Sequence, residues 1–127
     1  MRTTASPMSV AFARISTAED FSYGFRDFLD RFREAPDLAL ISDEPASLTE
    51  ALNDDGLADA YLASIAAWLA HRHGLPVPEW AAGTARALGK PWFAAKTHKL
   101  RMVLLQESPT EFRVRNLFVS ANALSRA

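Results

Sequence analysis

Apolar residues recur at helical spacing over much of this chain, and the first clear stripe lies in residues 21–32. Its members are Phe21, Phe25, Phe28, Leu29 and Phe32, which share one face of a helix with about 3.6 residues per turn. Ser16 or Thr17 can cap this helix, because an acidic residue follows each of them three positions later. Four phenylalanines on one face favour a role in the core, with a groove on a partner as the alternative.

A second long pattern predicts a helix over residues 57–73. Its apolar face holds Leu57, Tyr61, Leu62, Ile65, Trp68 and Leu69. The preceding Asp54 and Asp55 can cap the helix, and Gly74 followed by two prolines ends it. Between the two long helices, Ser47 and Glu50 have the spacing of a capping box, which predicts a short helix to about residue 53.

The remaining segments are short. Residues 38–41 form an apolar run that fits either a helical turn or a short buried strand, and periodicity does not decide between them. Thr97 can cap a helix that continues through Leu100, Val103, Leu104 and Leu105. The run Ser108-Pro109-Thr110-Glu111 predicts another helix start, with Ser108 as its N-cap. Residues 117–119 can be extended, and a last turn over residues 120–126 would pack Leu124 inward.

These patterns predict an all-α protein with about five to six helices, some of them very short, and proline-rich connections. A chain of 127 residues has room for one hydrophobic core, so we expect a single compact domain over residues 16–127. Residues 1–15 have no comparable pattern, and we expect them to be a flexible N-terminal arm.

Composition and hydropathy indicate the cellular compartment in which we expect this protein. The chain has no cysteine, so it has no disulfide and no thiolate chemistry. Its N-terminal region lacks the apolar run of a signal peptide. The most apolar window, residues 57–70, is too short to span a bilayer and contains Asp59. We therefore expect a cytoplasmic protein without a membrane partner.

Charge is distributed unevenly, although the net charge is −1. Residues 37–59 hold seven acidic and no basic side chains, whereas residues 86–127 hold eight basic and two acidic ones. Such asymmetry bears on partners and long-range attraction rather than on fold. It also fits two solvated faces of one domain, or an acidic segment that lies near the basic one.

No motif predicts catalysis, a metal site or a cofactor. Residues 83–90 resemble a phosphate-binding loop, but five residues separate the two glycines and Pro91 follows the lysine. His71 and His73 point about 200° apart on a helix, so they cannot chelate one ion together. We predict that the chain is not an enzyme, and we interpret its histidines as solvated or packing residues.

The C-terminal third offers candidate partner-binding residues: Arg101, Arg113, Arg115, Asn116 and Phe118. Arginine guanidinium groups that lie between large apolar side chains suit binding to a carboxylate-rich protein surface or to phosphates. In the alternative interpretation, some of these arginines tie the short terminal helices together, for example through unpaired backbone carbonyls.

The same region carries residues in a distinctive order: Pro91-Trp92-Phe93, Leu100-Arg101, Leu104-Leu105, Glu107-Ser108-Pro109, Phe112-Arg113, Arg115-Asn116-Leu117-Phe118-Val119 and Asn122-Ala123-Leu124-Ser125-Arg126-Ala127. This order of residues resembles the tail of a family of small bacterial proteins. The same tail also occurs as the C-terminal module of some helix-turn-helix regulators of the Xre type. The resemblance extends back through Asp59-Ala60-Tyr61-Leu62 and residues 75–80.

The resemblance implies an antitoxin-like protein. Free-standing members of the family are encoded beside a nucleotidyltransferase-like protein, in what look like toxin–antitoxin pairs. It therefore implies that the chain binds and neutralises a cognate toxin, with a nucleotidyltransferase-like protein as one candidate. No helix-turn-helix precedes the module here, so residues 1–55 supply no operator-binding element. Two alternatives stay open: a regulatory nucleic-acid-binding module and a small ligand-binding or enzymatic domain.

Overall fold

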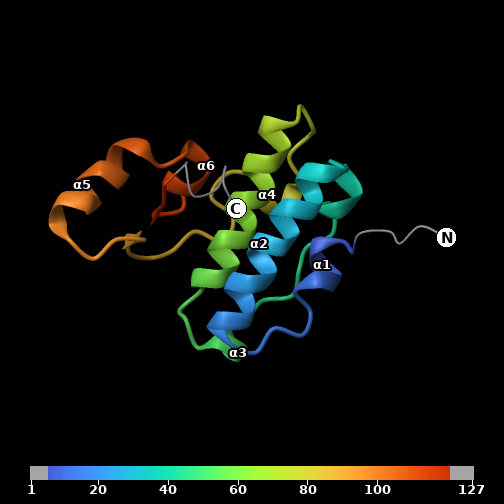
Figure 1. The fold of residues 1–127 in the computed structure, drawn as a ribbon, viewed down its shortest axis with the longest axis horizontal. Coiled ribbons are helices and arrows are strands. Elements are labelled where there is room, and N and C mark those ends of the chain that lie inside the picture. The colour runs from blue at the N-terminus through green and yellow to red at the C-terminus, as the bar shows by residue number, and fades with distance from the viewer. Residues whose placement is uncertain (1–5, 121–127) are drawn as a thin grey trace.

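The computed structural model describes residues 6–120, and this part of the chain is mostly helical (Figure 1). The α-helices are α1 (Met8–Ala11), α2 (Ala18–Glu34), α3 (Thr49–Leu52), α4 (Leu57–Arg72), α5 (His98–Glu107) and α6 (Thr110–Arg113). Two short 3₁₀ turns, Leu38–Leu40 and Glu79–Ala81, lie in the connections. The two-residue strands β1 (Trp92–Phe93) and β2 (Leu117–Phe118) pair in parallel. The all-α prediction is confirmed.

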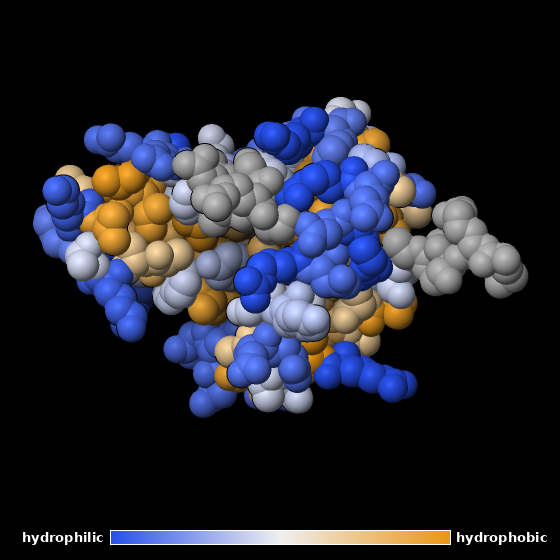
Figure 2. Space-filling model, in the orientation of Figure 1, coloured by the Kyte–Doolittle hydropathy of each residue, from blue (hydrophilic) through white to orange (hydrophobic). Residues whose placement is uncertain are grey.

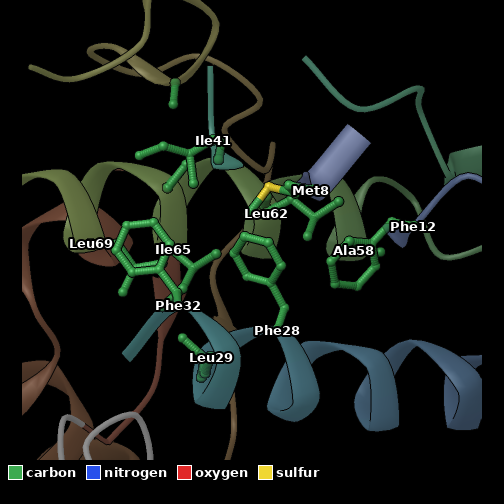
Figure 3. Packing of buried hydrophobic residues seen from close by; sticks show 14 of the residues in the cluster. Met8, Phe12, Phe28, Leu29, Phe32, Ile41, Ala58, Leu62, Ile65 and Leu69 are labelled. Atoms are coloured by element: carbon green, nitrogen blue, oxygen red, sulfur yellow. The ribbon is translucent and has the colours of Figure 1, made fainter. Parts of the chain in front are cut away.

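The core lies mainly between α2 and α4 (Figure 3). On the α2 side, Phe28, Leu29 and Phe32 are buried, as the phenylalanine stripe predicts. The alanine-rich α4 has no continuous polar face, and eleven of its sixteen residues are buried. A helix without a polar face belongs in the interior of a fold. Here α2, α3, α6 and the 79–81 turn surround α4.

The predicted caps of the long helices are confirmed. The Thr17 hydroxyl accepts a hydrogen bond from the backbone N–H of Asp20, at 3.0 Å. The Asp54 carboxylate accepts from the N–H groups of Gly56 and Ala58 at the start of α4. These bonds satisfy donors that have no partner within the helix. The cap at Ser47 is different, because α3 begins after Leu48 and the Ser47 hydroxyl binds Asp59 instead.

The N-terminal segment differs from the predicted flexible arm over the part that the structure describes. Residues 8–11 form α1, and the Met8 and Phe12 side chains are buried in the core. Phe12 packs against the rings of Phe21 and Phe28, at 5.5 and 6.1 Å between centroids. The reason is tertiary: a short helix with two large apolar side chains covers an open edge of the α2 stripe. Residues 1–5 lie outside the described residues.

The C-terminal third forms a projecting unit. Strand β1 pairs with β2 in the register Trp92 to Leu117 and Phe93 to Phe118. Helices α5 and α6 both lie in the connection between the two strands, and α5 lies at the end of the molecule opposite α1 (Figure 1). We call residues 90–107 the arm.

The prediction of an extended segment at 117–119 is confirmed for residues 117–118, whereas residues 38–40 are a helical turn. The turn predicted at 120–126 lies almost entirely outside the described residues.

Ser108 has a different role from the predicted N-cap. It ends α5: its hydroxyl donates to the Leu104 carbonyl at 2.6 Å and accepts from the backbone N–H of Val119 at 2.9 Å. Because Ser108 is buried, both of its bonds lie inside the protein. Ser108 therefore joins the end of α5 to the segment after β2. Helix α6 follows at Thr110, with Pro109 at its N-cap position.

No helix within residues 6–120 is long and apolar enough to cross a membrane.

Candidate protein-interaction site

Helix α5 exposes apolar side chains to solvent. The exposed fractions are 53% for Leu100, 48% for Met102, 39% for Val103 and 40% for Leu105. Leu104 is the one residue of α5 that is buried. At about 100° per residue, Met102 points about 160° away from Leu104. Apolar side chains therefore surround the helix, and most of them are uncovered. Of the four apolar residues that mark this helix in the sequence, Leu100, Val103, Leu104 and Leu105, the structure buries only Leu104.

The surface of the molecule shows the consequence. Apolar residues gather over the end where α5 lies (Figure 2). On neither α4 nor α5 do the apolar residues form a single stripe, but α4 is central, whereas α5, in which five of ten residues are polar, is peripheral. Clustered exposed apolar side chains mark interaction sites more often than scattered single ones do. Helix α5 is therefore the strongest candidate for an interaction surface in the described chain.

A small cluster holds the arm in place. The rings of Phe93 and Phe118 stack at 4.7 Å between centroids. The Arg101 guanidinium lies over the Phe93 ring at 5.6 Å, and its Nε donates to the Ala95 carbonyl at 3.1 Å. Thr97 caps α5 as predicted, accepting from the backbone N–H of Leu100. These contacts fix α5 relative to β1 and β2 and leave its outer sides open.

Arg115 is not available to a partner in this structure, which corrects its place among the predicted partner-binding residues. Its side chain is 1% exposed. The guanidinium donates to the backbone carbonyls of Ala81 at 2.5 Å, Glu111 at 2.6 Å and Ala85 at 2.7 Å. Burial lowers the pKa of Arg115, and the nearby Glu111 charge opposes that change. Arg115 therefore ties α6 to the segment 81–85, as the structural alternative proposes.

The other predicted residues divide into two groups. Asn116 is partly buried and donates to the Leu88 carbonyl at 2.9 Å, and Phe118 is buried under Phe93. Arg101 and Arg113 are exposed. Arg113 donates to the Ser108 carbonyl at 2.9 Å, close to the end of α5. The structure therefore leaves two of the five, Arg101 and Arg113, on the surface near α5.

The arm is basic as well as apolar. Residues 90–107 contain Lys90, Lys96, Lys99 and Arg101 against a single acid, Glu107. All five side chains are exposed. Cations beside exposed apolar side chains suit a protein surface that is itself apolar and acidic. The arm thus carries four of the eight basic side chains of residues 86–127.

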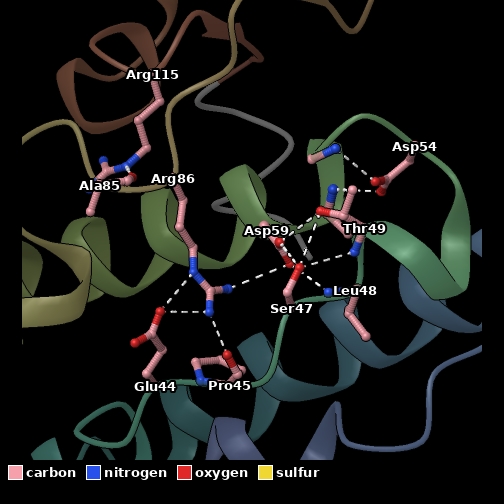
Figure 4. Close-up of polar contacts among 12 residues, drawn as sticks. Glu44, Pro45, Ser47, Leu48, Thr49, Asp54, Asp59, Ala85, Arg86 and Arg115 are labelled. Atoms are coloured by element: carbon pink, nitrogen blue, oxygen red, sulfur yellow. Dashed lines mark hydrogen bonds and ion pairs between the residues drawn. The ribbon is translucent and has the colours of Figure 1, made fainter.

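The acidic segment 37–59 is only partly neutralised within the molecule (Figure 4). Asp59 accepts hydrogen bonds from the Ser47 hydroxyl at 2.6 Å, the Leu48 N–H at 2.8 Å and the Thr49 hydroxyl at 3.0 Å. Arg86 lies 3.6 Å from Asp59 and 2.9 Å from Glu44. These contacts join residues 44–49 and the start of α4 to Arg86, whose backbone adopts a left-handed conformation, φ +60°.

The histidines show no metal site. Nδ1 of His71 lies 2.6 Å from the Glu111 carboxylate, which links α4 to α6. The His73 ring packs against Phe32 at 5.3 Å. Over residues 6–120, no group of three histidine or acidic side chains is placed to hold an ion.

Sequence reasoning missed the exposure of α5. A signal was present, because five of the six residues from 100 to 105 are apolar and do not form one stripe. Such a pattern predicts burial on several sides, which residues 6–120 do not provide. Comparison with known protein families, with curated proteins and with solved structures finds no match for this chain.

Proposed function

We propose that this protein binds another protein through α5 and acts as an antitoxin that neutralises a cognate toxin by covering its surface. The observation that carries the proposal is the apolar, basic helix held at one end of the molecule with most of its side chains uncovered. The family resemblance supports the antitoxin role and suggests a nucleotidyltransferase-like toxin. The proposal assigns no catalytic step to this chain.

The charge of the arm indicates the chemistry of the partner. Lys96, Lys99 and Arg101 would face carboxylates around an apolar patch on the toxin. Metal-binding acids of a nucleotidyltransferase-like active site would supply such carboxylates. Exposed Leu100 and Leu105 favour a protein over a nucleic acid, because nucleic-acid-binding surfaces are more polar and much more positively charged than protein–protein interfaces.

The test uses the tagged full chain to capture proteins from cells of its native host. Wild type is compared with Leu105→Glu, which places a charge on the exposed side of α5. Val10→Glu is the matched control, because Val10 is exposed and apolar but belongs to α1, at the opposite end of the molecule. We expect one protein that wild type and Val10→Glu capture and Leu105→Glu does not.

The captured protein is then expressed alone and together with the chain. The proposal expects growth arrest when it is expressed alone, relief by wild type, and no relief by Leu105→Glu. A captured protein that binds Leu105→Glu equally well would contradict the α5 surface. A captured protein that has no effect on growth would contradict the antitoxin role.

A further inference from the structure

Helix α5 is stabilised by very little buried surface. Nine of its ten residues are exposed, and Leu104 alone is buried. Leu104 is also not a member of the core cluster to which α2 and α4 contribute. Burial of one leucine side chain shifts a folding equilibrium by about ten- to hundredfold. Because helices shorter than about 12–15 residues are marginal in water on their own, this single side chain decides much of the stability of α5.

The charges at the two ends of α5 also oppose its formation. The N-terminus of a helix carries partial positive charge, and the C-terminus carries partial negative charge. Helices α2 and α4 follow the favourable pattern, with acidic side chains in the first turn and basic ones in the last. Helix α5 has Lys99 in its first turn and Glu107 as its last residue, with no acidic side chain in the first turn and no basic one in the last. Of these three helices, α5 is therefore the least stabilised by its own charges.

The segment that carries α5 is anchored at both ends by contacts that do not involve the helix. On one side, the Ala94 N–H donates to the Phe118 carbonyl at 2.9 Å. On the other side, the Val119 N–H donates to the hydroxyl of the buried Ser108, also at 2.9 Å. The two anchors lie on neighbouring residues after β1 and α5. Residues 95–107 are therefore a loop whose ends stay together whether or not α5 is helical.

We propose that residues 95–107 open as a unit in the free protein, so that α5 unfolds and refolds while the core and the β1–β2 pair stay folded. Opening breaks few contacts: the burial of Leu104 and its carbonyl bond to Ser108, the Thr97 cap, and the contacts of the exposed Arg101. Proteins open locally in this way at free energies well below that of global unfolding, and segments with few buried apolar contacts open most readily.

Opening also bears on how the partner binds, a step that rests on the proposed function. A partner that contacts Leu100, Met102 and Leu105 together requires the helix, because an unfolded loop does not hold these side chains at fixed positions. The partner therefore binds the closed state and slows its opening. A change that leaves α5 mainly open should weaken binding, even where the altered side chain does not touch the partner.

The test is backbone amide hydrogen exchange in the full chain, measured as the factor by which each amide exchanges more slowly than in an unfolded chain. We expect protection below about hundredfold for residues 102–107, since one buried leucine holds them. Central amides of α4 should be protected at least about thousandfold, because they exchange through nearly global unfolding. Equal protection in α5 and α4 would overturn the inference. So would a complete lack of protection in α5, because the closed state would then not be the main one.

A first pair of variants tests the role of the single buried side chain. Leu104→Ala should lower the protection of α5 by about tenfold or more and leave that of α4 unchanged. Leu105→Ala is the matched control, because Leu105 is the next residue of the same helix and is 40% exposed. It should change neither. An equal loss of protection in α4 and α5 of Leu104→Ala would show that α5 unfolds only with the whole protein, which would overturn the inference.

A second pair tests the helix charges without altering any buried side chain. Lys99→Glu places a favourable charge in the first turn of α5 and should raise its protection by about threefold or more. Lys90→Glu makes the same change of charge on the arm outside the helix and should leave that protection unchanged. An α5 whose protection responds neither to Leu104→Ala nor to Lys99→Glu would contradict local opening.

The same measurement, repeated with the captured protein bound, separates this inference from the proposed function. Additional protection of α5 by tenfold or more in the complex would support both. Opening in the free chain without additional protection in the complex would leave the inference standing and contradict the α5 surface. A partner that protects α5, together with an α5 that opens only with α4 in the free chain, would do the reverse.

Discussion

Replacing Arg115 by methionine should destabilise the protein strongly. Arg115 is buried, and its guanidinium donates to the carbonyls of Ala81, Ala85 and Glu111. Methionine has a comparable length and no hydrogen-bond donor, so it fills much of the space and leaves three carbonyls without their donor. The change therefore tests the hydrogen bonds rather than the packing.

The magnitude follows from those three bonds. Hydrogen bonds to a charged group contribute about 1.5–3 kcal/mol each. Methionine also removes the cost of burying the guanidinium, so we take the low end of that range for each bond. The expected loss is about 4–5 kcal/mol in the free energy of unfolding. Domains of this size have total stabilities of about 5–15 kcal/mol, so the variant should be marginal.

Thermal unfolding followed by circular dichroism measures this loss. For a domain of this size, 1 kcal/mol corresponds to roughly 3–6 °C in Tm, so Arg115→Met should melt roughly 12–30 °C below wild type. Arg113→Met is the control, because Arg113 is exposed and makes one bond to the Ser108 carbonyl. It should cost about 1 kcal/mol or less. Equal melting temperatures for the two variants would refute the structural role of Arg115.

Three other predictions concern the rest of the fold. Asp59→Ala should cost about 3–5 kcal/mol in chemical denaturation, because it leaves the buried Leu48 N–H without its acceptor and Arg86 without one of its two carboxylates. Asp43→Ala, at an exposed acidic position, should change stability by less than about 0.5 kcal/mol. Equal losses in the two variants would refute a stabilising role for the contacts of Asp59. Burial raises the pKa of Tyr61 to about 12. In Tyr23→Phe, where Tyr61 is the one remaining tyrosine, tyrosinate absorbance should therefore titrate with a midpoint near 12. A midpoint near 10 would contradict this burial. Because the folded pKa of Tyr61 lies above the ordinary value of 10, stability should fall as the pH rises from 10 towards 12.

The features that sequence predicted correctly are local. Thr17, Asp54 and Thr97 cap helices through bonds to residues two to four positions away. Such bonds depend on the order of neighbouring residues, so a single sequence contains the information. The phenylalanine stripe of α2 is also local in this sense, because helical spacing alone places its residues on one face.

The features that sequence did not predict depend on distant partners. Arg115 bonds to carbonyls 30 and 34 positions away, and nothing near it in sequence distinguishes it from the exposed Arg113. Phe12 is buried because α2 has an open edge, which a pattern within residues 1–15 does not contain. For α5, the apolar pattern correctly indicates that the helix needs cover on several sides. It does not say whether that cover comes from this chain or from another.

The most direct measurement of the central claim is site-specific photo-crosslinking in living cells. A photoreactive amino acid is placed at Met102, which is 48% exposed on α5, and at Val10 on α1 as the control. The proposed function predicts a covalent adduct between position 102 and a growth-inhibiting protein, which Leu105→Glu in the same chain abolishes and which position 10 does not form. Absence of any adduct from position 102, or equal adducts from both positions, would contradict the claim that α5 is the interaction surface.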